Sequence, residues 1–399
     1  MTRWIDTMFV RGGTSKGLLF EAAALPGGLA LPGDPAADPA ALRERDAILC
    51  AALGSPDRFG RQLDGMGGGV SSLSKAMIVD RSARPGIDLD YTFAQVSVDA
   101  AAVDYAGNCG NLSSAVVPFA LAAGLISRED GPQRFALWNT NTGKRVDVRL
   151  TVRGGLAEAA GGLSIPGVSG SGSPIELVYP DPGGSRTSGL RPTGCAVDEL
   201  EVDGRAVRVS LVDATTPLVL IAAADAGATG AELPAELDAN TAAMEVLERL
   251  RRAGAVRMGL CADPETAPLA VPKVVVIAPA EASRQLDGAE LPASEVDLLA
   301  RTLSMGRTHN AVPGTAAMCL AAAAETPGSV AAEAAGSGRP GGSLRIGTPS
   351  GVVTAGAVVA HCRADDAALD APFAVEASLV RTARILMRGS VAVEMSPGR

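Results

Sequence analysis

The fold is decided by two stretches of the sequence, GNCGNLSSAVVPFA at residues 107–120 and HNAVPGTAAMCLA at residues 309–321. In each stretch a short polar loop containing glycine leads into an Ala-rich segment, which is typical of a helix that begins at a tight turn. The two stretches lie about 200 residues apart in a chain of 399 residues. An offset of about half the chain predicts that the protein consists of two related halves.

Two further pairs of segments keep the same order and offset. A strand-like run meets a Thr/Ser turn at residues 8–15 and again at residues 209–216. A lysine opens an apolar strand at residues 74–79 and again at residues 272–277. Together with the helical stretches, these pairs predict an α+β fold of two pseudo-symmetric halves. Each half is expected to be a curved, mostly antiparallel sheet around a central helix.

The division between the halves is expected in a segment rich in Gly, Ser and Pro, residues 161–194. We therefore expect an N-terminal half at residues 1–190 and a C-terminal half at residues 191–399. This division leaves room for the last strand or helix to pack back on the first half. Helical periodicity predicts four main helices. They are expected at residues 40–50, after Asn111, at residues 241–253 and after Thr315.

The composition narrows the classes of function. Aromatic residues make up only 3% of the chain, so few side chains are available to stack on the bases of single-stranded nucleic acid. A formal net charge of -9 without any Lys/Arg-rich run also argues against a nucleic-acid surface. No apolar stretch approaches the roughly 20 residues needed to cross a bilayer, and the first residues do not resemble a secretory signal. A cytoplasmic protein without membrane contact is therefore expected.

Cysteine and histidine usage indicates no metal site. The six cysteines lack C-x-x-C spacing, and the chain has only two histidines. This pattern matches neither a zinc site nor a small disulfide framework. Free thiols are expected in a reducing compartment.

The loop at residues 107–111 is the sharpest local signal for chemistry. A helix that begins at a Gly-containing turn leaves its first N–H groups unpaired, and the positive end of its dipole favours a carboxylate. Cys109 on this turn feels the same field, which favours a thiol that exchanges protons with carbon acids. The alternative is an ordinary helix cap in which Cys109 is a small buried filler.

The second half offers a corresponding helix start at Gly314 and Thr315. This start is a candidate site for a second carboxylate. Pro313 stands where the first half has Cys109, so this half lacks the corresponding acid/base group. The alternative is that Thr315 is a simple helix cap.

The run GMGGGVSSLSK at residues 65–75 combines four glycines, three hydroxyls and a lysine. Such a loop lets the backbone approach a ligand closely, and Lys75 supplies a charge or, with a depressed pKa, a base. The spacing does not match G-x-x-x-x-G-K-[ST], so a nucleotide P-loop is not expected. The alternative is a surface lysine at the start of a strand.

Two more turns and one histidine are candidates for substrate contacts. RGGTSKG at residues 11–17 combines hydroxyls, including Ser15, with two cations, and Ser350 lies in a tight turn between strands. Turns of this kind are usually structural. A lone histidine such as His309 is likewise more often structural than functional.

Taken together, these motifs closely resemble the 2-methylaconitate cis-trans isomerase family of the PrpF type, which includes 4-oxalomesaconate tautomerases, 3-methylitaconate isomerases and aconitate isomerases. The matching segments occur in order over nearly the whole chain. They are RGGTSKG (11–17), DGMGGGVSSLSK (64–75), GNCGNLS (107–113), RPTG (191–194), RMGL (257–260), SMGRTHNAVPGTAA (304–317) and TPSG (348–351). Seven ordered motifs are far more specific than any one of them.

The resemblance implies a fold similar to diaminopimelate epimerase, with two α+β halves and the active site in the cleft between them. It implies that Lys75 abstracts the proton and that Cys109 is either a second proton carrier or a substrate contact. Carboxylate contacts are implied for Asn108, Gly110, Asn111, Gly314 and Thr315, with Ser15, Ser74, His309 and Ser350 as neighbours.

The activity implied by the resemblance is that of a cofactor-independent isomerase, which abstracts and returns an allylic proton on a small unsaturated tricarboxylate. Cis-trans isomerisation of 2-methylaconitate or aconitate is the leading interpretation. The alternatives are a 4-oxalomesaconate-type tautomerase, a methylitaconate or aconitate double-bond isomerase, and a non-catalytic tricarboxylate-binding relative. An amino-acid epimerase is disfavoured because Pro313 replaces the second cysteine. The expected partner is a small anionic di- or tricarboxylate, and a homodimer is left open.

Overall fold

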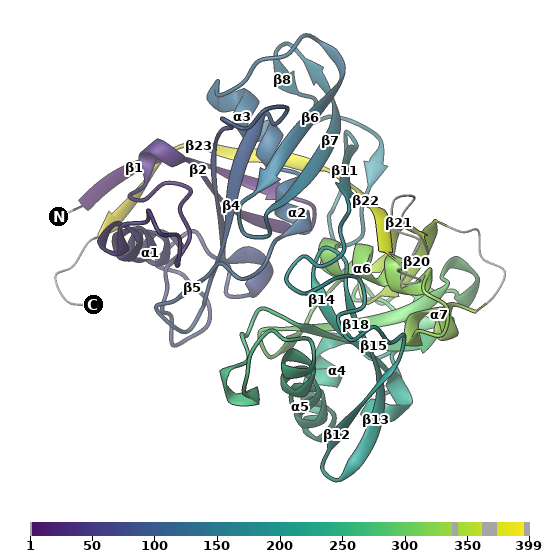
Figure 1. Ribbon diagram of the computed structural model, residues 1–399. Helices are drawn as coiled ribbons and strands as arrows, with labels where there is room; N and C mark the ends of the chain where they lie inside the picture. The colour runs from purple at the N-terminus through teal and green to yellow at the C-terminus, as the bar shows by residue number, and fades with distance from the viewer. Residues whose placement is uncertain (1, 337–341, 361–372, 395–399) are drawn as a thin grey trace. The chain divides into compact units, whose positions relative to one another are not determined.

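Two units of chain, each with its own core, make up the structure, a computed structural model that describes residues 2–336, 342–360 and 373–394 (Figure 1). The first unit comprises Met1–Leu177 and Arg381–Arg399, and the second comprises Val178–Val380. The first boundary falls inside the segment 161–194 that was expected to connect the halves. The last strand belongs to the first unit. The domain division expected at residues 190/191 stays a prediction.

The first unit is built on a mixed sheet. Its strands are β1 (Thr2–Gly12), β2 (Ser15–Glu21), β3 (Lys75–Arg81), β4 (Leu89–Val96), β5 (Val103–Asp104), β6 (Gly131–Asn139), β7 (Lys144–Arg153), β8 (Leu156–Ala157) and β23 (Ala383–Glu394). The main order is β23, β1, β2, β3, β4, β6, β7. Within this order the β2–β3 and β4–β6 pairs are parallel, and the other pairs are antiparallel.

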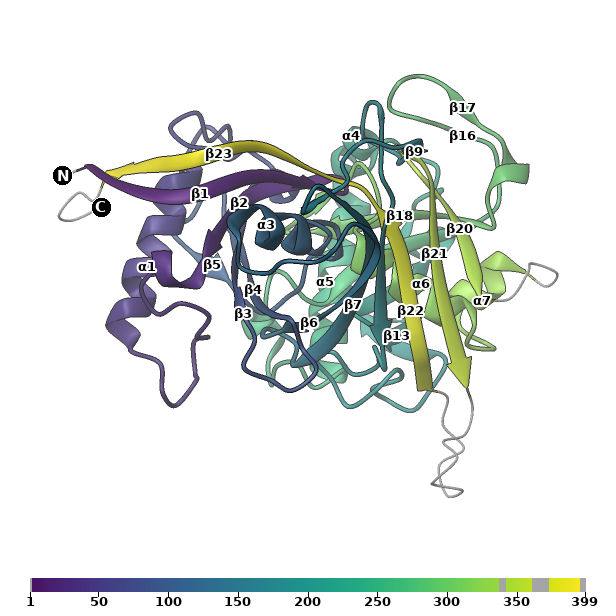
Figure 2. The ribbon, with the colours of Figure 1, turned by 90° about the horizontal axis from the view of Figure 1, so that it is seen from above.

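Helices cover this sheet on two sides. They are α1 (Pro39–Leu53), α2 (Gly110–Ser113) and α3 (Val116–Ala123), with short turns η1 (Ala22–Ala24) and η2 (Ser71–Leu73). Ile48 and Leu49 of α1 pack with Leu18 and Phe20 of β2 in one fully buried core. The α3 helix is buried from Val116 to Leu121, and Figure 2 shows it inside the curve of the strands. It is therefore the central helix of this unit.

The second unit repeats this plan with its own strands. They are β12 (Asp198–Val202), β13 (Arg205–Asp213), β14 (Pro217–Ala222), β15 (Lys273–Pro279), β18 (Leu298–Ser304), β19 (Arg307–Thr308), β20 (Ser343–Thr348), β21 (Gly351–Ala360) and β22 (Phe373–Arg381). The main order is β12, β13, β14, β15, β18, β20, β21, β22. The β14–β15 and β18–β20 pairs are parallel, as β2–β3 and β4–β6 are in the first unit.

The helices of the second unit take corresponding places. They are α4 (Pro234–Ala239), α5 (Thr241–Arg257), α6 (Gly314–Ala324) and α7 (Val330–Ala335), with short turns η3 (Ala223–Ala226), η4 (Pro264–Thr266) and η5 (Ala293–Glu295). Leu247 and Leu250 of α5 pack with Val219 and Val274. Every residue of α6 is buried. The strand pairings and the two central helices confirm the internal repeat that the sequence predicts.

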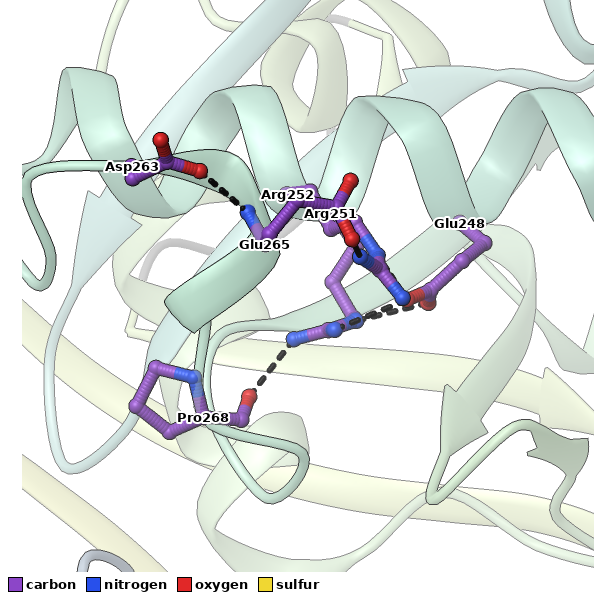
Figure 3. Close-up of polar contacts among 6 residues, drawn as sticks. All are labelled: Glu248, Arg251, Arg252, Asp263, Glu265 and Pro268. Atoms are coloured by element: carbon purple, nitrogen blue, oxygen red, sulfur yellow. Dashed lines mark hydrogen bonds and ion pairs between the residues drawn. The ribbon is translucent and has the colours of Figure 1, made fainter.

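Buried arginines on the outer helices hold neighbouring loops in both units. On α1, Arg45 donates to the carbonyl oxygens of Gly28 at 2.8 Å and Ala30 at 2.7 Å. On α5, Arg251 donates to the carbonyl oxygen of Pro268 at 2.6 Å (Figure 3). Glu248 holds this arginine from within the same helix, at 2.7 Å. The segment that leads into β15 is thereby fixed to α5.

The four predicted helices are all present, as α1, α3, α5 and α6. The structure adds α2, α4 and α7, which are too short to show a clear helical period in the sequence. The segment 161–194 also contains the short strands β9 (Leu163–Ser164), β10 (Ser171–Gly172) and β11 (Ile175–Pro180). Among the described residues, no helix combines the length and apolar character needed to span a bilayer.

Candidate functional site

Lys75 lies at the first position of β3, and its residue is only 7% exposed. The pairing of β3 with β4 places Gln95 directly opposite. The lysine Nζ donates to the side-chain oxygen of Gln95 and lies 5.0 Å from the centre of the Phe93 ring. In the described part of the chain, Lys75 forms no ion pair with a carboxylate. The charge of this lysine is therefore not neutralised by an acidic side chain.

Burial lowers the pKa of Lys75 below the ordinary value for lysine, because an ammonium group loses its hydration inside the protein. The nearby Cys109, in its thiolate form, opposes this effect by Coulombic attraction. Burial is the larger of the two influences. The neutral amine, which is the form that accepts a proton, is consequently more populated than on a surface lysine.

Cys109 occupies the cap position of α2, with its backbone in the extended region. Its sulfur accepts from the N–H of Leu112 at 3.4 Å, and its thiol lies 3.8 Å from Oγ of Ser15. Asn108 fixes the turn by accepting from the N–H of Cys109 at 2.7 Å. The structure thus brings Ser15, Asn108 and Cys109 together beside Lys75. The interpretation of Cys109 as a cap residue is confirmed, and a chemical role is compatible with that position.

The first turn of α2 carries two of the predicted carboxylate contacts. Gly110 and Asn111 hold its first two positions, where backbone N–H groups have no intrahelical partner. The Asn111 side chain, however, is already occupied, since its amide nitrogen donates to Oγ1 of Thr14 at 3.0 Å. A substrate contact from Asn111 is therefore more consistent with its backbone N–H than with its side chain.

The turn between β1 and β2 packs directly onto this helix start. A Cβ atom on Gly12 would lie 2.6 Å from the backbone oxygen of Asn111, and one on Gly17 would lie 2.3 Å from the backbone oxygen of Lys75. Gly13 adopts a φ of 54°, which favours glycine. The glycines of RGGTSKG therefore let the turn approach both Asn111 and Lys75.

Arg381 is a member of this site that the sequence analysis missed. Its Nε donates to Oδ1 of Asn111 at 2.8 Å, and its residue is only 5% exposed. Burial lowers the pKa of Arg381 to about 10, with Cys109 as the opposing influence. Since Arg381 lies 270 positions from Asn111 in the chain, no local motif could link the two residues.

Ser74 and the glycine-rich loop are held by Gln62, which is also absent from the sequence prediction. The Gln62 amide nitrogen donates to Oγ of Ser74 at 2.7 Å, and its oxygen accepts from the N–H of Gly69 at 3.0 Å. A Cβ atom on Gly67 would lie 2.3 Å from that oxygen. At least part of the glycine content is therefore required for packing within the loop. A substrate contact from the Ser74 hydroxyl stays a prediction.

The remaining predicted residues belong to the second unit. Gly314 and Thr315 are buried at the start of α6, and the Thr315 carbonyl oxygen accepts from Oγ1 of Thr215 at 2.8 Å. His309 donates its backbone N–H to the Thr302 carbonyl oxygen at 2.8 Å. Oγ of Ser350 donates to a carbonyl oxygen in the neighbouring loop at 2.7 Å. Substrate contacts from these four residues stay predictions.

Among the residues that the structure describes, acidic, cysteine and histidine side chains do not gather in a way that suits a metal ion. Within residues 2–336, 342–360 and 373–394, no group of three or more such residues has that arrangement. The prediction that the protein uses no metal and no cofactor stays a prediction.

Known sequences match this chain over almost its whole length. The profile of the family described as PrpF protein matches residues 2–394. The chain is 37% identical to the 2-methyl-aconitate isomerase of Cupriavidus necator, over 98% of this chain and 97% of the relative. It is 33% identical to the 3-methylitaconate isomerase of Eubacterium barkeri, over 98% and 97%. It is 38% identical to the (4E)-oxalomesaconate Delta-isomerase of Novosphingobium sp. (strain KA1), over 97% and 96%.

Comparison with solved structures supports the same fold. A crystal structure of methylitaconate-delta-isomerase matches with a TM-score of 0.75 and 31% identity, covering 100% of this chain and 98% of that chain. A hydroxyproline epimerase from Agrobacterium vitis matches with a TM-score of 0.54 and 15% identity, over 98% and 94%. The second likeness concerns the fold alone. The predicted α+β, epimerase-like fold is confirmed.

Proposed function

Because the chain belongs to the PrpF protein family, we propose that it is an isomerase that abstracts and returns an allylic proton on a small unsaturated tricarboxylate. Its membership of this family and its class, an isomerase, confirm the expectations from the sequence. The leading substrates are 2-methylaconitate and aconitate, with a cis-trans change as the reaction.

One observation carries this proposal: Lys75 is a buried lysine with a lowered pKa, held by a neutral amide beside a cysteine. A general base must be unprotonated at working pH and must lie within reach of the reacting carbon. Burial favours the first property because it lowers the pKa of Lys75, and the position of Lys75 at the start of β3, close to Ser15 and Cys109, supports the second. A structural lysine needs neither property.

The proposed reaction begins when the Lys75 amine takes a proton from an allylic carbon of the substrate. The C–H bond breaks, an N–H bond forms, and the electron pair spreads over the double bond and an adjoining carboxylate. Backbone N–H groups in the first turn of α2, at Gly110 and Asn111, are proposed to stabilise that negative charge. They are fixed before the reaction, so little reorganisation is required.

The proton then returns to carbon, and Lys75 is restored as the neutral amine. Return to the same carbon after rotation gives the cis-trans change, whereas return to the other end of the allylic system shifts the double bond. Cys109 is proposed as either a second proton carrier or a substrate contact. A single geometry can serve both outcomes, and relatives named for different isomerisations are 33–38% identical to this chain.

Further substrate contacts are proposed from the other predicted residues. They are Ser15, Ser74, Asn108, His309, Gly314, Thr315 and Ser350. We also retain the proposals that the protein is cytoplasmic, uses no metal or cofactor, binds no nucleic acid or membrane, and is compatible with a homodimer.

Product analysis by proton NMR tests the choice of substrate. The purified protein would be incubated with cis-aconitate, 2-methylaconitate, methylitaconate and oxalomesaconate, each in parallel with Lys75→Ala. The proposal predicts that a cis-trans isomer forms from 2-methylaconitate or aconitate and that the variant forms none. Formation of a shifted double bond instead would identify a tautomerase or methylitaconate-type isomerase. Binding of a tricarboxylate without turnover of any compound would leave a non-catalytic relative.

A further inference from the structure

We propose that Gln95 is a positioning residue of the isomerase, whose side-chain oxygen holds Nζ of Lys75 in a fixed, uncharged setting. This inference rests on the proposed function, because it assigns how the base of that reaction is prepared. Gln95 lies on β4 directly opposite Lys75 and is 7% exposed. No sequence motif singles it out.

The orientation of the Gln95 amide is determined by its surroundings. Its nitrogen donates to the backbone carbonyl oxygens of Ser71 at 3.1 Å and Ser74 at 2.9 Å. Carbonyl oxygens only accept hydrogen bonds, so both of them require the NH₂ end of the amide. The oxygen end must then face Lys75, where it accepts from Nζ. The loop before β3 thus fixes the glutamine, and the glutamine fixes the lysine.

A fixed hydrogen bond at Nζ matters because a neutral amine has two N–H groups and one lone pair. When one N–H is donated to Gln95, rotation about the last carbon–nitrogen bond is restricted and the lone pair has a defined direction. Proton abstraction from carbon depends strongly on such alignment. The Phe93 ring, whose centre lies 5.0 Å from Nζ, is a second uncharged neighbour of the amine.

The neutrality of Gln95 is the second part of the inference. Burial lowers the pKa of Lys75, and a carboxylate at the position of Gln95 would counteract this by stabilising the ammonium form. Other titratable groups lie on the elements around Lys75. They include Lys16 on β2, Tyr91 on β4, Asp104 on β5 opposite Gln95, Cys109 at the start of α2, and Arg381 at the end of β22. Glu21, Asp80, Arg81 and Asp90 lie at the far ends of β2, β3 and β4. Of these, Cys109 is the group that acts on the pKa of Lys75.

The Asp104 carboxylate is engaged in a local hydrogen bond. It accepts from the backbone N–H of Ala106 at 2.6 Å. Gln95 lies between Asp104 and Lys75 in the strand register, since it pairs with both residues. A neutral amide therefore separates Lys75, the proposed base, from the carboxylate of the next strand.

The variant Gln95→Glu tests the inference because it changes the charge and keeps the shape. The pH profile of kcat/KM reports the pKa of the essential base in the free enzyme. We expect the acid limb of this profile to move to higher pH by about 1 to 3 units, since an opposite charge at contact distance shifts a pKa by that amount. Gln133→Glu, which adds the same charge on β6 outside the site, is the matched control and should keep the wild-type profile.

A second variant keeps the inference testable if the glutamate disturbs folding. Gln95→Met removes the hydrogen bond without adding a charge, so kcat should fall about 10- to 100-fold. KM should change less than about threefold, and the acid limb should not move to higher pH, because loss of an acceptor cannot stabilise the ammonium form. Circular dichroism and thermal melting would establish that each variant is folded. A folded Gln95→Glu with the wild-type profile, or a folded Gln95→Met with the wild-type kcat, would overturn the inference.

The Lys75→Ala variant separates failure of this inference from failure of the proposed function. If Lys75→Ala abolishes turnover while both Gln95 variants behave like the wild type, only the role of Gln95 is rejected. If Lys75→Ala retains full turnover, the proposed base itself is wrong and the inference falls with it.

Discussion

Lys75 in the first unit and Lys273 in the second open corresponding strands, β3 and β15. The β3 strand pairs in parallel with β2, and β15 pairs in parallel with β14. Their surroundings differ. Lys75 is buried and donates to the Gln95 side chain, whereas Lys273 is half-buried and donates to the backbone carbonyl oxygen of Ala270 at 2.7 Å. The same scaffold therefore places a lysine twice in different surroundings, and Lys75 is the one proposed as the base.

The starts of helices α2 and α6 also differ in the residue at the cap position. Cys109 caps α2 in the first unit, and Pro313 precedes α6 in the second. The second unit nevertheless keeps the glycine at the first helical position, Gly314. The comparison shows that a repeated fold can keep a glycine at both helix starts while, of these two described starts, only the first has a cysteine at its cap position. If the proposed function holds, both starts bind carboxylates and proton transfer belongs to the first unit, an asymmetry that substitutions of single residues test.

Substitution of Cys109 should give the largest of these effects. If the thiol carries a proton in the reaction, Cys109→Ala should lower kcat by about 10²- to 10⁴-fold, the range for a positioned acid or base. Steady-state kinetics measure this. Cys319→Ala, in the buried part of α6, is the control for loss of a thiol. A change in KM with an unaltered kcat would instead identify Cys109 as a substrate contact.

Loss of the two buried arginines on the outer helices should destabilise the units unequally. Arg45 is fully buried and binds two loop carbonyls and the Tyr105 hydroxyl, whereas Arg251 is 6% exposed and binds one loop carbonyl and the partly exposed Glu248 of its own helix. Arg45→Met should reduce the free energy of unfolding by about 2 to 4 kcal/mol and Arg251→Met by about 1 to 2 kcal/mol. Urea titrations measure both. Equal effects would contradict this ranking.

Removal of Arg381 should impair the proposed carboxylate site at the start of α2 without unfolding the first unit. Arg381→Met leaves the Asn111 side-chain oxygen without its guanidinium partner, so we expect kcat/KM to fall about 10- to 100-fold, or about 1.4 to 2.7 kcal/mol. Arg388→Met is the control, because this exposed residue of β23 contacts only the distant Ala122 carbonyl in the described structure. A wild-type rate in Arg381→Met would exclude Arg381 from the site.

The lowered pKa of Lys75 also predicts a pH-dependent stability. Between its folded pKa and the unfolded value near 10.5, the unfolded state binds more protons, so stability rises with pH in that window. One such group contributes at most about 1.4 kcal/mol per pH unit. Lys75→Met should therefore exceed the wild type in stability most at low pH, and the difference should shrink as pH rises. A constant difference across the alkaline range would contradict the lowered pKa.

The sequence predicted those parts of the site that lie in contiguous motifs. Ser74 and Lys75 end a glycine-rich loop, and Cys109 lies in the turn before a helix, so local pattern and helix electrostatics identify them. The repeat likewise predicted two related halves, each with a sheet around a central helix, because hydrophobic runs and turns recur at a constant offset.

The sequence could not identify the partners that tertiary structure supplies. Gln95 faces Lys75 only through the register of β3 with β4, and an interior strand residue carries no signal of that contact. Arg381 reaches Asn111 because the last strand returns to the first unit. Gln62 lies near the glycine-rich loop in sequence, but its positive φ of 51° and its bonds depend on the folded loop.

Solvent-deuterium incorporation tests the central claim most directly, because it detects proton transfer whether or not the isomer accumulates. The substrate that the wild type turns over would be incubated in deuterium oxide with Lys75→Ala and with Lys273→Ala, the matched lysine of the second unit, and the allylic positions followed by NMR. We predict that label enters with the wild type and Lys273→Ala and fails to enter with Lys75→Ala. Label that enters with Lys75→Ala at the wild-type rate, or is lost only in Lys273→Ala, would contradict the assignment of the base to the first unit.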